Sequence, residues 1–101
     1  TVTIANAERG EASLVVDGKT IILRPTFQAL VAAEAELGPL FQLVDRAVEG
    51  GLTLQETAAL FHHLAVGEVS RAAVGQAIVE QGLATTAPNL RIILGQVLQG
   101  R

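Results

Sequence analysis

The residues best suited to chemistry are few in this sequence and form no recognisable catalytic set. The only histidines, His62 and His63, are adjacent. On a helix their side chains would diverge by about 100°, so they cannot readily grip one metal ion together. Neither lies in the His-Glu-x-x-His arrangement of zinc enzymes. We therefore expect a structural role for both, with metal binding or general-base catalysis as the weaker alternative.

The carboxylates are dispersed and each has a structural explanation. Asp17 suits a turn and Glu56 suits a helix cap. Glu34 and Glu36 are two positions apart, so on a helix they point to different faces. The chain has no cysteine, no serine in a nucleophile-elbow context, and no glycine-rich loop followed by Lys-Ser or Lys-Thr. We predict that the protein is not an enzyme and holds no cofactor or metal.

The composition indicates one small domain, residues 1–101, with a largely aliphatic core. Half of the 101 residues are hydrophobic and only 17% are charged, which leaves ample apolar surface to bury. No apolar run approaches the about 20 residues that a membrane-spanning helix needs, so we expect no membrane partner. The absence of cysteine fits a reducing cytoplasm. The net charge is −3 and the basic residues are scattered, which does not favour nucleic acid binding.

A β-hairpin over residues 11–24 is the strongest local prediction. Two β-rich runs flank Asp17-Gly18, a pair that favours a two-residue type I′ turn because both positions need a positive φ. The register that this turn imposes also sorts the alternating residues into an apolar and a polar face. It places Glu11 opposite Arg24, a favourable charge pair.

Apolar residues at helical spacing fill the region 26–99. The pattern predicts helices that start after Thr26, Pro39, Thr53 and Ser70, and a fifth helix from about Ala87 to Gln99, with Pro88 in its first turn. The expected core stripes are Phe27, Leu30, Val31 and Leu37; Leu40, Leu43, Val44, Ala47 and Val48; Leu54, Ala58, Phe61, Leu64 and Ala65; Val74, Ala77 and Ile78; and Leu90, Ile93, Leu94, Val97 and Leu98.

These elements predict an α+β fold. An isolated hairpin is only marginally stable in water, so the N-terminal antiparallel hairpin should pack its apolar face on a cluster of four to five short helices. Residues 1–10 show no clear period, and we expect them to form a loose leader.

Residues 54–81 have the outline of a helix-turn-helix. The second helix would read DNA, yet it offers only Arg71 among Gln76, Glu80 and Gln81. One arginine with acidic neighbours is poorly suited to reading a groove. A small DNA-binding regulator is therefore an alternative function, and nucleic acid is not the partner that we expect.

Four apolar residues fall outside the expected core stripes. Val15 and Ile22 lie on the polar face of the hairpin, Leu83 lies in a connection, and Ile92 lies beside the main stripe of the last helix. Either the small domain wraps them, or they form a patch for a partner or for self-association. We name all four as candidate partner-binding residues.

Several turn, cap and core motifs match a known family. They are Arg9-Gly10-Glu11, the Asp17-Gly18 hairpin, Leu23-Arg24-Pro25-Thr26-Phe27-x-Ala29-Leu30, Glu34-x-x-Leu37-Gly38 and Gly51-Leu52-Thr53. Over about residues 9–66 the chain resembles the tail-protein family of gene transfer agents and related prophages. That family is labelled phage tail tube or tail assembly protein and is similar to tail assembly chaperones. No catalytic residues come with it.

The resemblance implies a non-enzymatic tail assembly protein that acts through protein–protein contacts. Tail tube subunits that stack into rings are mostly built on β-sheets, whereas this chain is mostly helical. We therefore expect a tail assembly chaperone for a tape measure or tube protein, in which an apolar groove holds helical segments and the hairpin edge can accept a strand. The alternative is a tube component retained in the particle. The expected location is the cytoplasm of a bacterial host, or the phage-like particle.

Overall fold

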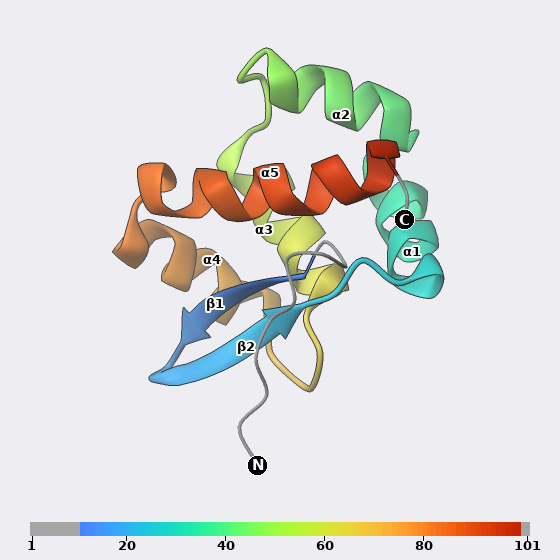
Figure 1. Ribbon diagram of the computed structural model, residues 1–101. Coiled ribbons are helices and arrows are strands. Elements are labelled where there is room, and N and C mark those ends of the chain that lie inside the picture. The colour runs from blue at the N-terminus through green and yellow to red at the C-terminus, as the bar shows by residue number, and fades with distance from the viewer. Residues whose placement is uncertain (1–10, 100–101) are drawn as a thin grey trace.

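The computed structural model describes residues 11–99, which form one hairpin followed by five helices (Figure 1). The elements are β1 (Ala12–Val16), β2 (Lys19–Leu23), α1 (Phe27–Leu37), α2 (Leu40–Val48), α3 (Leu54–Leu64), α4 (Arg71–Gln81) and α5 (Leu83–Gln99). This order confirms the predicted α+β class. The expectation of a loose leader over residues 1–10 lies outside the described residues.

The hairpin forms in the predicted register, with β1 and β2 antiparallel. Asp17 and Gly18 have φ values of 51° and 76°, so both turn positions adopt the positive φ that a type I′ turn requires. The Arg24 Nε donates to the Glu11 carboxylate at 2.5 Å. Alternate residues of β1 are buried, which places its apolar face against the helices.

Ile22, one of the four candidate partner-binding residues, is buried by the domain, and its side chain is only 5% exposed. The chain between α3 and α4 runs beside β2 at this point. The Val66 N–H donates to the Ile22 carbonyl and the Arg24 N–H donates to the Leu64 carbonyl, both at 2.8 Å. This third segment pairs with the hairpin over a long sequence separation, which residue periodicity does not predict. Because its side chain is buried, Ile22 offers little surface to a partner.

The outer edge of β1 is also occupied. The Gln81 Nε2 of α4 donates to the Val15 carbonyl, and the Asn89 Nδ2 of α5 donates to the Ser13 carbonyl, both at 2.7 Å. These amides satisfy backbone acceptors that face away from β2. The idea that a hairpin edge accepts a partner strand therefore finds no support in the described structure.

Three of the predicted helix starts are confirmed by their caps. Side-chain oxygens of Thr26, Thr53 and Ser70 each accept a backbone N–H three residues further on. Thr53 and Glu56 form the full capping box, since the Glu56 carboxylate also accepts the Thr53 N–H. Each cap satisfies backbone donors that the first turn leaves unpaired.

The last helix starts earlier than predicted. It begins at Leu83 instead of Ala87, so Leu83 lies in α5 and Pro88 lies inside the helix. Gly82 adopts a φ of 84°, which lets the chain turn from α4 into α5 within one residue and leaves no separate connection.

The central element is α3, which packs against α1, α4 and β2. Its buried residues are Thr57, Ala58, Ala59, Leu60, Phe61 and Leu64. Phe61 is fully buried and is the largest side chain of the core. Figure 1 shows α3 behind α5 in the middle of the molecule.

Some of the residues expected in the core are instead exposed. Phe27 of α1 is 82% exposed and Val31 is 47% exposed, whereas the only fully buried residue of that helix is Ala33. Packing a small alanine against α3 lets the two helices approach closely, and it turns the larger side chains outward. In α2, Val48 is 79% exposed, because it faces the open hollow between α2 and α5.

The difference between buried and exposed phenylalanines is testable. We expect Phe61→Ala to lower the free energy of unfolding by about 3–5 kcal/mol, because it leaves a cavity at the centre of the core. Phe27→Ala removes the same atoms from an exposed site and should change stability by no more than about 0.5 kcal/mol. Urea denaturation followed by circular dichroism measures both; equal effects would contradict the core assigned here.

Candidate partner-binding surface

An apolar groove runs between α2 and α5. Its largest hollow has a volume of about 490 Å³, and hollows of about 290 Å³ and 230 Å³ adjoin it at its two ends and share lining residues with it. We call these three hollows the α2–α5 groove. The residues that line the largest hollow are Val44, Ala47, Val48, Ala87, Leu90, Arg91, Leu94, Gly95 and Leu98.

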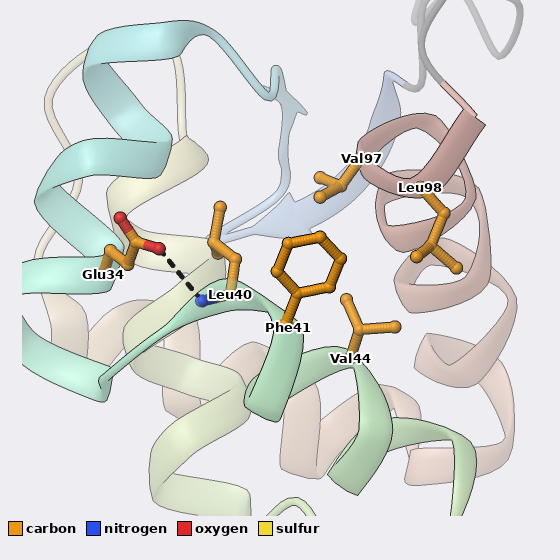
Figure 2. A pocket seen from close by; sticks show the side chains of 6 residues that line it. All are labelled: Glu34, Leu40, Phe41, Val44, Val97 and Leu98. Atoms are coloured by element: carbon orange, nitrogen blue, oxygen red, sulfur yellow. Dashed lines mark hydrogen bonds between the residues drawn. The ribbon is translucent and has the colours of Figure 1, made fainter.

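Figure 2 shows the end of the groove where α2 begins. Phe41 points from α2 toward Val97 and Leu98 of α5 and stays 80% exposed. On the α1 side, the Glu34 carboxylate accepts the Leu40 N–H at 3.0 Å and caps the start of α2. The groove is thus open to solvent at an aromatic side chain.

The lining of the groove does not suit a small-molecule site. Such sites combine an apolar wall with several convergent polar groups, whereas Arg91 is the only charged residue on the largest hollow. Among residues 11–99, no group of three His, Asp or Glu could hold a metal ion. The lining of the largest hollow is thus apolar apart from Arg91.

An ion pair holds α2 to α3 beside this groove. Arg46 donates through both terminal nitrogens to the Glu56 carboxylate, at 2.5 and 2.6 Å. Arg46 first, and then the Thr53 N–H, lower the pKa of Glu56 to about 2. Sequence reasoning explained Glu56 by the helix cap alone, and it missed Arg46 because that residue is ten positions away.

A second ion pair ties three helices together. The Glu36 carboxylate of α1 accepts from Arg71 of α4 at 2.5 and 2.7 Å and lies 2.7 Å from the His63 Nε2 of α3. Arg71 and then His63 lower the pKa of Glu36 to about 2. His63 thus has a structural contact. Arg71 is occupied by Glu36 instead of being free for DNA, which weighs against the helix-turn-helix regulator.

The four candidate residues named from the sequence do not form one patch. Val15 is 49% exposed on the hairpin and Leu83 is 62% exposed at one end of the α2–α5 groove. Ile92 is half-buried on α5 and does not line the groove, while Ile22 is buried.

Sequence reasoning missed the exposed phenylalanines. Phe41 lies outside the apolar stripe expected for its helix. An aromatic residue outside the stripe of an amphipathic helix indicates an exposed aromatic side chain, and this signal was present in the sequence. Phe27 gave no such signal, because it fits the stripe of α1 and only the orientation of that helix exposes it.

The two ion pairs predict a modest loss of stability in acid. The carboxyls of Glu36 and Glu56 have their pKa lowered from 4.5 to about 2, so both stabilise the folded state above pH 4.5. Their contribution is lost as the pH falls from about 4.5 to about 2. We expect Glu56→Gln to destabilise the protein at neutral pH and to flatten the loss of stability across this range. Denaturation curves across the range test this.

The matched control is Glu49→Gln, which removes a carboxylate that forms no ion pair within residues 11–99. It measures the effect of losing one negative charge alone. A Glu56→Gln variant that matches Glu49→Gln at every pH would show that the Arg46 contact contributes nothing.

Comparison with known proteins gives one match. The family described as "Phage tail tube protein, GTA-gp10" matches residues 9–100, which extends the resemblance noted for residues 9–66 through α4 and α5. No curated protein and no solved structure matches. Among residues 11–99, no helix is both long and apolar enough to span a membrane. The match covers nearly the whole chain, and the chain therefore belongs to this gene transfer agent and phage tail family, with a structural or assembly role in a phage-type tail.

Proposed function

We propose that the protein is a tail assembly chaperone. In this role it binds an apolar helical segment of another tail protein, of which an elongated tape measure protein is the best example, and shields that segment until assembly. The contact requires exposed apolar side chains on a rigid support and no chemistry.

The observation that carries this proposal is an exposed apolar strip on α1. Phe27, Val31 and Ala35 are spaced by four residues, so they lie along one side of the helix, and all three are exposed. Phe27 is 82% exposed. We call these three residues the α1 strip. A helix of a partner can lie along it and cover the aromatic ring, which makes Phe27 the natural anchor.

The support beneath the strip is rigid. α1 packs extensively on the central helix α3. Glu36, which also lies on α1, contacts Arg71 of α4 and His63 of α3. A hollow of about 370 Å³ lies beside Val31 and Ala35. A partner segment would therefore meet a preorganised surface, which lowers the entropic cost of binding.

The alternative is a tube subunit that stays in the particle, and the description of the matching family favours it. A tube built by joining sheets from neighbouring subunits needs open strand edges. Here the hairpin has backbone acceptors already engaged along both edges. This arrangement supports the chaperone over the sheet-based tube. Val15, Leu83 and Ile92 are further candidate contacts for either partner.

Co-expression with the tape measure protein of the same tail gene cluster tests the proposal. We expect the wild-type chain to keep the tape measure protein soluble, and Val31→Asp to weaken binding by about tenfold, because it places a charge in the apolar contact. Val79→Asp is the matched control, since Val79 is a similarly exposed valine on α4.

The composition of finished particles separates the two functions. A chaperone is absent from purified tails, whereas a tube subunit is present in many copies. Recovery of this chain as a major particle component would overturn the chaperone proposal and establish the tube alternative.

A further inference from the structure

The structure buries only some of the apolar residues of α2. Leu43 and Val44 are buried, while Phe41 and Val48 are 80% and 79% exposed. These two exposed residues are seven positions apart and therefore lie on one line along the helix. A nine-residue helix that exposes a phenylalanine and a valine on one line has an apolar face that the described chain leaves mostly open to solvent.

The α2–α5 groove that borders this face has room for a further helix. Ala47, Ala87 and Gly95 are small residues in its lining, and a Cβ atom built on Gly95 would meet no heavy atom within 4 Å. Small residues on a helix face let another helix approach closely. The groove and the exposed line of α2 thus form one continuous apolar surface.

The charges beside the groove are complementary to each other. Arg91 lines the largest hollow and forms no ion pair within residues 11–99. Asp45 is exposed on α2, four positions after Phe41 and three before Val48, and forms no ion pair in the same range. The apolar lining and Arg91 suit a helix that carries apolar residues and a carboxylate on one side. α2 itself has Phe41, Asp45 and Val48 on one side.

We propose that a second copy of this chain occupies the groove. In a two-fold symmetric dimer, α2 of each copy lies in the α2–α5 groove of the other. Phe41 and Val48 then pack on the apolar lining, and Asp45 of each copy pairs with Arg91 of the second copy. This surface lies on α2 and α5, apart from the α1 strip, so the proposal does not depend on the chaperone function.

Charge reversal gives a decisive test with the full chain. We expect the wild type to form dimers in analytical ultracentrifugation. Asp45→Arg and Arg91→Asp, each examined alone, place like charges at both symmetric contacts and should weaken dimerisation by about a hundredfold. An equimolar mixture of the two variants should form dimers again, because the mixed dimer has one Arg–Asp pair at each contact.

The control is Glu68→Arg, which reverses an exposed charge outside the groove and should leave the dimer unchanged. Circular dichroism establishes that each variant is folded. Three results would overturn the proposal: a monomeric wild type at all concentrations, a dimer that neither charge reversal weakens, or weakened variants whose mixture does not recover. A monomeric wild type has a second reading if Asp45→Arg and Arg91→Asp both lose binding to another tail protein. In that case the occupant of the groove is that protein and not a second copy.

Discussion

Burial of α3 is the constraint on which the rest of this structure depends. A helix with Leu60, Phe61 and Leu64 fully buried, and two alanines beside them, needs neighbours on several sides. α1, α4 and the hairpin supply them. Because Ala58 and Ala59 are small, these neighbours approach the helix closely, and the core closes with a single aromatic ring. The other two phenylalanines of the chain are left on the surface.

The ion pairs arrange the helices around this core more than they stabilise it. Partly exposed ion pairs contribute little to the free energy of folding. Glu36 instead connects α1 to α3 and α4, and Arg46 connects α2 to α3. α2 has only a short contact with α1, and it is held by the burial of Leu43 and Val44, by the Arg46 contact and by the Glu34 cap. The side of α2 that bears Phe41 and Val48 stays exposed, and it borders the α2–α5 groove.

The sequence was informative wherever a few neighbouring residues decide the structure. The Asp17-Gly18 turn set the hairpin register, and capping side chains such as Thr53 set the helix starts. It was uninformative wherever distant segments meet. No local pattern shows that residues 64–66 pair with β2. None shows that Ile22 is buried, or that α1 turns Ala33 inward and Phe27 outward. The candidate surface depends on these orientations, so sequence reasoning predicted a partner-binding protein without locating its surface.

The two proposed surfaces would act together in tail assembly. The α1 strip has one aromatic anchor and small neighbours, so a single strip would bind a partner helix weakly and release it readily. A dimer formed through the α2–α5 groove would present two such strips, because α1 contributes only Glu34 to the lining of the groove. A long helical partner that reaches both strips would gain avidity without any new contact. Weak individual contacts combined in this way would hold an elongated protein before assembly and still release it, since each strip could be displaced separately as the tail forms.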